Sequence, residues 1–137
     1  MFTITHTTRR VLVADDDPVM RHLVTSAVKS LDYEVVIAND GREAYRILQS
    51  DADFKAAVFD LMMPNLRGLD VIRYMRTEKR LMRIPAMMIT TETDSKLTSE
   101  ILAAGAMVFL PKPFTREQLQ TTLRMLLNTM NGARKAA

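Results

Sequence analysis

Three observations in the sequence predict an α/β fold in which helices cover both faces of a parallel sheet. Five short apolar runs alternate along the chain with five segments whose apolar residues recur at helical spacing. The connections between these segments are short, and no internal repeat or low-complexity stretch interrupts them. Strands that alternate with helices on short connections favour a parallel sheet. The order of the strands cannot be read from periodicity.

The five predicted strands are apolar runs bounded by turn-forming or charged residues, a pattern typical of strands buried inside a sheet. They span residues 9–14, 33–38, 54–59, 86–89 and 106–110. The third run ends abruptly at Asp60, and Pro64 follows in the loop. This ending predicts that the Asp60 carboxylate stands at the rim of the sheet, where open parallel sheets bind ligands.

Capping signals mark the predicted helices. The helices run from Pro18 to about Leu31, from Gly41 to about Ser50, from the loop after Asn65 to just before Pro85, from Asp94 to Ala103, and from Thr115 to about Thr129. Asp17 is a good N-cap, and Pro18 suits the first helical position. Thr115 with Gln118 forms a capping box, and Gly105 fits a left-handed helix stop.

The composition indicates one globular domain. The chain has 137 residues, of which 47% are hydrophobic and 26% charged, with a net charge of +3. It has no cysteine, which excludes disulfides and thiolate metal sites. Neither a signal peptide nor a membrane span is visible, which points to the cytoplasm. We expect a single domain over residues 1–137, with its core at about 9–129 and flexible ends at 1–8 and 131–137.

Polar side chains of complementary kinds follow four of the predicted strands. Asp15 and Asp16 follow the first strand, Asp60 the third, Thr90 the fourth and Lys112 the fifth. Because the carboxyl ends of parallel strands meet at one edge, we expect these residues to form one site. Neighbouring carboxylates raise each other's pKa, and Mg²⁺, which prefers oxygen ligands, relieves the conflict. An aspartate there can be a nucleophile, so the pattern predicts Mg²⁺-assisted phosphoryl transfer onto a carboxylate.

Four motifs in this order and spacing resemble a CheY-like receiver domain of two-component response regulators. They are Asp15-Asp16-Asp17-Pro18, Phe59-Asp60-Leu61-Met62-Met63-Pro64 with Gly68, Ile89-Thr90-Thr91, and Lys112-Pro113-Phe114. The resemblance covers roughly residues 9 to 128. It implies a flavodoxin-like (βα)5 doubly wound fold, with a five-stranded parallel sheet in the order 2-1-3-4-5. Because no output domain follows the last motif, we expect a stand-alone receiver.

The resemblance also implies an acceptor and a metal site. Asp60 would accept a phosphoryl group from a histidine kinase or a histidine phosphotransfer protein. Asp16 and Asp60 would bind Mg²⁺ directly, together with the main-chain carbonyl of Met62, and Asp15 would act through water. The protein would then be a signalling switch with slow autodephosphorylation, and not an enzyme.

Further positions match the switch and the lifetime determinants of the family. Thr90 would hydrogen-bond the phosphoryl group and Lys112 would pair with it. Phe109 would follow Thr90 inward and change the surface of the fourth helix, fifth strand and fifth helix, to which a downstream protein binds. Met62 and Glu92 occupy the positions that tune the phosphoryl lifetime.

A haloacid-dehalogenase-type phosphatase is the rival interpretation. There Asp15 would be the nucleophile and Asp17 the general acid, again with Mg²⁺. That family needs a further acidic pair after its lysine, whereas only Glu117 follows Lys112 at this end of the chain. The phosphatase reading also leaves Asp60 without a role.

A basic set on and after the third helix has two interpretations. Its members are Arg73, Arg76, Lys79, Arg80 and Arg83. They form either a solvated helix face or a docking stripe for an acidic partner. Binding of nucleic acid through this stripe would make the chain a pure interaction module, but no DNA-binding domain or stacking-aromatic platform is evident.

Overall fold

The computed structural model describes residues 9–91 and 94–136, with side chains up to residue 128. Its centre is a five-stranded parallel sheet in the order β2-β1-β3-β4-β5. The strands are β1 (Arg10–Ala14), β2 (Glu34–Ala38), β3 (Ala56–Asp60), β4 (Ala86–Thr90) and β5 (Val108–Pro111). The fold class predicted from the sequence and the strand order implied by the resemblance are both confirmed.

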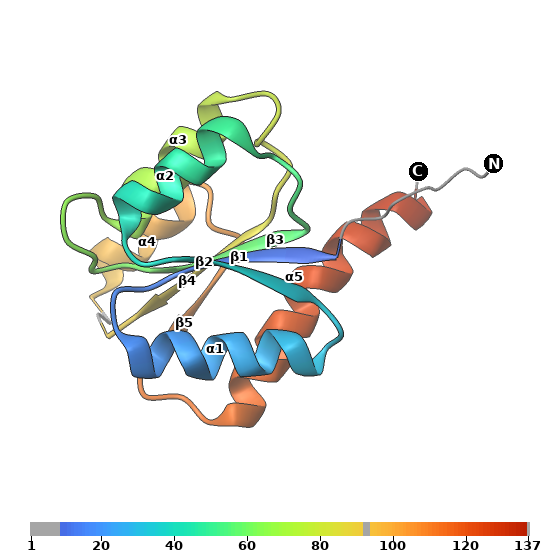
Figure 1. Ribbon diagram of the computed structural model, residues 1–137, viewed down its shortest axis with the longest axis horizontal. Coiled ribbons are helices and arrows are strands. Elements are labelled where there is room, and N and C mark those ends of the chain that lie inside the picture. The colour runs from blue at the N-terminus through green and yellow to red at the C-terminus, as the bar shows by residue number, and fades with distance from the viewer. Residues whose placement is uncertain (1–8, 92–93, 137) are drawn as a thin grey trace.

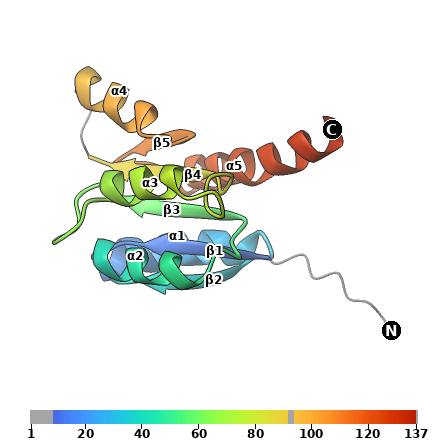
Figure 2. The same ribbon diagram turned by 90° about the horizontal axis from the view of Figure 1, so that it is seen from above.

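Helices cover both faces of this sheet. They are α1 (Pro18–Ser30), α2 (Gly41–Ser50), α3 (Gly68–Thr77), α4 (Ser95–Ala103) and α5 (Arg116–Ala136). Figure 1 shows α2, α3 and α4 on one face of the sheet and α1 and α5 on the other. The end of α5 projects past the sheet in Figure 2. In the described ranges, we find no helix with both the length and the apolar character needed to cross a membrane.

Two separate apolar cores lie on the two faces of the sheet. Leu12 and Phe59 point into the core under α2, α3 and α4, while their neighbours Val11 and Val58 point into the core under α1 and α5. Alternation along each strand therefore fills both cores at once. All residues of β3 and β4 are buried, which explains why these strands are nearly continuous apolar runs.

The helix ends confirm the capping residues read from the sequence. The Asp17 carboxylate accepts the Val19 N–H at 3.0 Å. Thr115 and Gln118 exchange hydrogen bonds of 2.8 and 3.0 Å at the start of α5. Gly105 has a φ of +112°, in the region that favours glycine. Two helices end at residues other than those predicted. The helix α3 ends at Thr77, well before Pro85, and α5 continues past Thr129 to Ala136.

Arg76 is not part of a solvated basic face, contrary to both interpretations of the basic set. Its half-buried guanidinium donates to the main-chain oxygens of Met82 and Ile84 at 2.9 and 3.1 Å. It also donates twice to the Gly105 oxygen, at 2.9 and 3.1 Å. Burial lowers the pKa of this guanidinium. Arg76 thus ties α3 to the turn before β4 and to the turn after α4.

Replacement of Arg76 by Met should destabilise the fold by about 2 kcal/mol, because partly buried carbonyls lose their donors. Equilibrium unfolding in urea measures the change. Arg73→Met is the matched control, since Arg73 is half-exposed and its ion pairs with Asp70 and Glu100 are 3.8 Å long. Such exposed pairs contribute about 0–1 kcal/mol. Equal losses in the two variants would contradict the linking role of Arg76.

Candidate functional site

The sheet register brings the carboxyl ends of four strands to one rim. Asp15 follows β1 and Asp60 is the last residue of β3. Thr90 ends β4 and is paired in register with Pro111 of β5. The main-chain N–H of Lys112 donates to the Thr90 oxygen at 2.8 Å, so Lys112 leaves β5 beside the end of β4. The cis peptide bond from Lys112 to Pro113 follows at once.

Three carboxylates crowd together at this rim. Asp15, Asp16 and Asp60 each place an oxygen within 4.8 Å of the other two. Asp15 is 2% exposed and Asp60 6% exposed, whereas Asp16 faces solvent. The Lys112 ammonium donates to an Asp60 oxygen at 3.2 Å. The residues that the sequence placed at four strand ends therefore do lie at one rim.

Burial sets the electrostatics of the cluster. Burial is the main cause that raises the pKa of Asp15 from 3.8 to about 6. The charges of Asp60 and Asp16 act in the same direction, and the hydrogen bond from the Asp17 N–H and the charge of Lys112 oppose them. Burial also raises the pKa of Asp60, while the neighbouring Lys112 opposes the increase. Two buried carboxylates thus share one cation. A hard divalent cation would offset the excess negative charge, and an all-oxygen donor set fits Mg²⁺.

In metal-free protein, Asp15→Asn should raise the free energy of unfolding above pH 6, by about 2 kcal/mol. The folded protein binds the Asp15 proton more tightly than the unfolded chain, because the folded pKa is raised. The charged carboxylate therefore destabilises the fold above pH 6, and the effect fades as pH falls to 3.8. Urea unfolding of both proteins across this range measures it. A gain that grew toward low pH would contradict the assignment.

Arg21 and Gly68 support the acidic rim, and sequence reasoning assigned neither a role there. The Arg21 guanidinium donates to the main-chain oxygen of Asp15 at 3.0 Å, which fixes the loop that carries the acids. Gly68 begins α3 against the main-chain oxygen of Asp60, where a Cβ would collide. The position of Arg21 in the sequence, one helical turn after Asp17, is the signal that could have predicted its contact with the acidic loop. The requirement for glycine arises from contacts between β3 and α3, which periodicity does not reveal.

The other residues singled out in the sequence lie around this rim. Thr90 is buried at the end of β4. Phe109 is half-buried and packs against the core under α2, α3 and α4. Met62 is 61% exposed in the loop after β3. Glu92 lies outside the described residues.

Comparisons with known proteins identify the family. The model of the response regulator receiver domain matches residues 11–124. Chemotaxis protein CheY1 of Helicobacter pylori is 36% identical over 121 residues, covering 88% of this chain and 98% of that protein. Chemotaxis protein CheY of Pseudomonas aeruginosa is 30% identical over 124 residues, covering 90% of this chain and 99% of that protein.

Solved structures agree with the sequence matches. Chemotaxis response regulator CheY4 of Vibrio cholerae superposes with a TM-score of 0.80 at 34% identity, covering 88% of this chain and 99% of that one. The receiver domain of sensor histidine kinase PA1611 from Pseudomonas aeruginosa has a TM-score of 0.78 at 27% identity, covering 88% of this chain and 98% of that one. None of these matches supports the phosphatase interpretation. The chain therefore belongs to the response regulator receiver domain family, and its role is that of a phosphoacceptor.

Proposed function

We propose that Asp60 accepts a phosphoryl group from a histidine kinase or a histidine phosphotransfer protein. The observation that carries the proposal is the environment of its carboxylate. Asp60 ends a central strand at the rim, shares the site with Asp15 and Asp16, and accepts a hydrogen bond from Lys112 at 3.2 Å. No other carboxylate of the cluster is paired with a cation among the described residues.

The transfer is a displacement at phosphorus. A carboxylate oxygen of Asp60 attacks the phosphoryl group of the donor, the P–N bond to the donor histidine breaks, and the imidazole leaves with the electron pair. The Lys112 ammonium, which donates to an Asp60 oxygen at 3.2 Å, would pair with a phosphoryl oxygen once the Asp60 carboxylate is phosphorylated. The Thr90 hydroxyl would hydrogen-bond another phosphoryl oxygen.

The donor set also supports a Mg²⁺ site, as found in the cleft of the receiver domain of PA1611, whose structure is described with a coordinated magnesium ion. Asp16, Asp60 and the main-chain carbonyl of Met62 would hold the ion directly, and Asp15 through water. Bound there, Mg²⁺ supplies charge neutralisation between the acids and the incoming phosphoryl oxygens. Asp15 and Asp16 directly follow β1, and this strand would hold their carboxylates in a fixed orientation at the site.

The output would be a change in the α4–β5–α5 surface. Thr90 ends β4, and Phe109 lies on the neighbouring strand against the core. Movement of Thr90 toward the phosphoryl group would let Phe109 turn inward. A downstream protein that binds the altered surface more tightly would then shift the population of receiver molecules toward the altered conformation. Met62, exposed beside the acceptor, and Glu92 would tune the lifetime of the phosphoryl group.

Incubation with acetyl phosphate and Mg²⁺ tests this function. We expect one phosphoryl group per chain, removed by hydroxylamine because it is an acyl phosphate, and absent when EDTA is present. Intact-mass measurement detects the group. A phosphate that resists hydroxylamine, or no incorporation at all, would overturn the proposal.

A further inference from the structure

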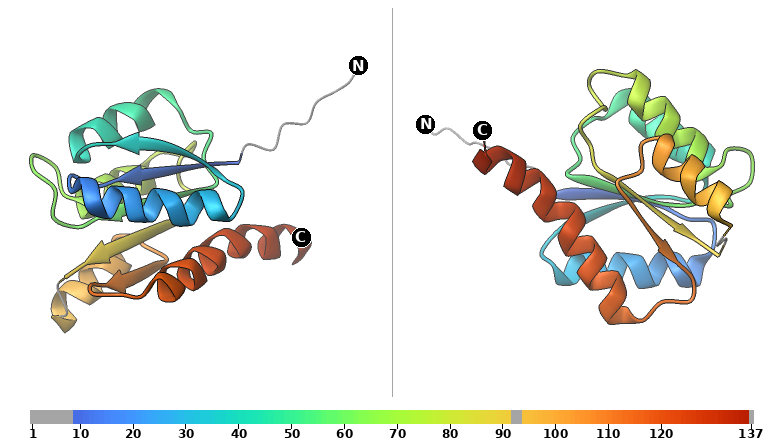
Figure 3. Two further views of the ribbon diagram at one scale, coloured as in Figure 1. Left: turned by 60° about the horizontal axis from the view of Figure 1, so that its bottom comes forward. Right: turned by 180° about the vertical axis from the view of Figure 1, so that it is seen from behind.

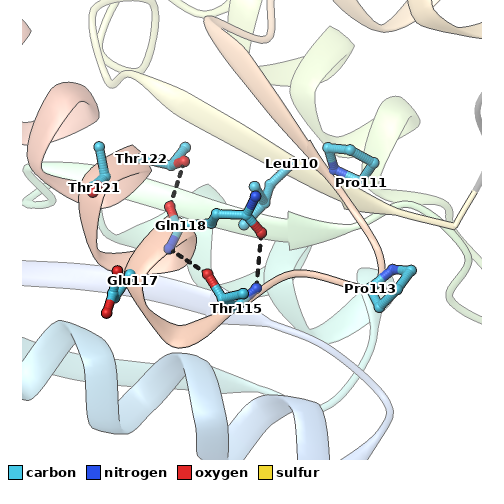
Figure 4. A pocket seen from close by; sticks show the side chains of 8 residues that line it. All are labelled: Leu110, Pro111, Pro113, Thr115, Glu117, Gln118, Thr121 and Thr122. Atoms are coloured by element: carbon cyan, nitrogen blue, oxygen red, sulfur yellow. Dashed lines mark hydrogen bonds between the residues drawn. The ribbon is translucent and has the colours of Figure 1, made fainter.

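The two edges of the sheet differ in the main-chain groups that they leave unpaired. At the β5 edge, the Lys112 N–H donates to the Thr90 oxygen of β4 at 2.8 Å. Because main-chain groups alternate in direction along a strand, those of Leu110 also face β4. Pro111, which has no N–H, lies between them at the end of β5 (Figure 4). The β5 edge therefore offers little to a further strand.

The strand β2 forms the opposite edge (Figure 2), and among the described residues it pairs only with β1. The Glu34 N–H, at its first residue, donates to the Arg9 oxygen at 2.6 Å. The Ala38 oxygen, at its last residue, accepts a hydrogen bond from the Asp15 N–H at 3.2 Å. Both ends of β2 therefore turn their main-chain groups toward β1.

Two residues of β2 turn their main-chain groups away from β1. By the same alternation, the groups of Val36 face β1, while the N–H and C=O groups of Val35 and Ile37 face the open edge. No charged residue or proline occupies these three positions, and the Ile37 side chain is 44% exposed. The middle of β2 therefore lacks the charges and prolines that keep other strands away from an edge.

A hollow of about 260 Å³ lies beside this edge. Ile37 lines it together with four residues at the start and middle of α1, which are Pro18, Arg21, His22 and Thr25. The Thr25 hydroxyl is buried and has no hydrogen-bond partner in the part of the chain that the structure describes. Figure 3 (left) shows β2 with α2 on one side and α1 on the other. Unpaired main-chain groups, an exposed apolar side chain and an unpartnered hydroxyl thus lie together along one edge.

We propose that two copies of this protein associate through this edge, with the two β2 strands antiparallel, so that one continuous sheet runs through the dimer. The two-fold axis passes beside Val36. Val35 of each copy then exchanges its outward hydrogen bonds with Ile37 of the other copy, because the groups of both residues face the edge. The Val35 and Ile37 side chains meet on the α1 face, and the two Val36 side chains meet on the other face.

Charge complementarity favours a second copy as the strand that adds to β2. In the antiparallel arrangement, the start of each β2 lies beside the end of the other, where α2 begins after a short turn. Val36 packs under α2, so Glu34, two residues earlier, lies on that same face. Glu34 and Arg42, in the first turn of α2, are both exposed, and neither forms an ion pair within the described ranges. Each Glu34 therefore meets an Arg42 of the second copy.

The dimer leaves the output surfaces free. The strand β5 lies at the edge of the sheet away from β2, so both α4–β5–α5 surfaces stay uncovered. A downstream protein with two binding sites would gain affinity from two such surfaces on one particle. The strand β3, which carries Asp60, is separated from the interface by β1, and the inference does not depend on phosphorylation.

Sedimentation equilibrium of the unaltered protein, together with amide hydrogen exchange followed by NMR, tests the interface. We expect dimers with a dissociation constant of about 50 μM. At about 1 mM protein, the Val35 and Ile37 amides should exchange about fivefold more slowly than at about 10 μM, while the Val36 amide, already bonded to β1, exchanges equally at both. A monomer at about 1 mM, or a dimer without this alternation, would overturn the proposal.

Ile37→Lys should weaken the dimer at least about tenfold, because it places a charge against the apolar Val35 of the second copy. Met107→Lys is the matched control, since Met107 lies just before β5 and is 48% exposed, against 44% for Ile37. The control should leave the dissociation constant unchanged. The opposite pattern would place the interface at the β5 edge and exclude the β2 dimer.

A charge exchange tests the antiparallel arrangement. Glu34→Arg and Arg42→Glu should each weaken the dimer about tenfold, because like charges then meet in two symmetric pairs, and the double variant should recover the original dissociation constant. Each variant should still accept a phosphoryl group from acetyl phosphate, which shows that it is folded. If the double variant does not recover the dimer, the proposed arrangement is wrong, and the acceptor role of Asp60 is unaffected.

Discussion

Asp60→Asn is expected to reduce phosphoryl incorporation from acetyl phosphate by about a thousandfold or more, because the variant lacks the attacking carboxylate oxygen. The fold should be retained, since Asn has nearly the same volume and can still accept the Lys112 hydrogen bond through its carbonyl oxygen. Phosphate labelling and intact-mass measurement follow the reaction.

Asp17→Asn is the matched control for this substitution. Asp17 lies at the same rim and caps α1 at 3.0 Å, but it does not belong to the three-carboxylate cluster. Asn is as good an N-cap as Asp, so the control should incorporate phosphate normally. Equal losses in the two variants, or full activity of Asp60→Asn, would show that the acceptor is a different residue.

Lys112→Met is expected to slow phosphoryl incorporation by about a hundredfold, because a preorganised cation at the developing charge is lost. Lys112 is the cation that the structure pairs with Asp60, at 3.2 Å, in the described part of the chain. Its loss also allows burial to raise the pKa of Asp60 further, which reduces the population of the nucleophilic carboxylate. The rate of incorporation at saturating Mg²⁺ measures the effect.

The control for Lys112→Met is Lys96→Met, which removes the same charge from an exposed position on α4. Net charge is therefore equal in the two variants, and only the cation beside Asp60 differs. If both variants incorporate phosphate at the same rate, the ammonium of Lys112 has no specific role at the acceptor.

Sequence patterns predicted most of the fold because apolar residues recur at helical spacing in the helices and form short continuous runs in the strands. The run that ends at Asp60 is buried on both faces of the sheet, and that burial is visible as a continuous apolar stretch. The length of α5 was harder to predict from the sequence. In the sequence, no apolar periodicity marks the last turns of this helix to Ala136, where Ala, Arg and Lys favour a helix despite Gly132.

The candidate site and its surroundings show which contacts can be predicted from the sequence and which cannot. Asp15, Asp60 and Lys112 could be brought together because each follows a strand of one parallel sheet. Arg76 could not be separated from its basic neighbours, since its partners are main-chain oxygens of Met82, Ile84 and Gly105, and main-chain oxygens carry no signature in a sequence. The same limit applies to the collision that would follow a Cβ at Gly68.

The most direct measurement locates the phosphoryl group in the unaltered protein. Borohydride reduces an acyl phosphate and converts the modified aspartate to homoserine, which peptide mass spectrometry assigns to one position. We predict homoserine at position 60, dependent on both Mg²⁺ and the phosphate donor. Homoserine at position 15, or modification of a residue outside the acidic rim, would contradict the central claim that the buried carboxylate of Asp60 is the acceptor.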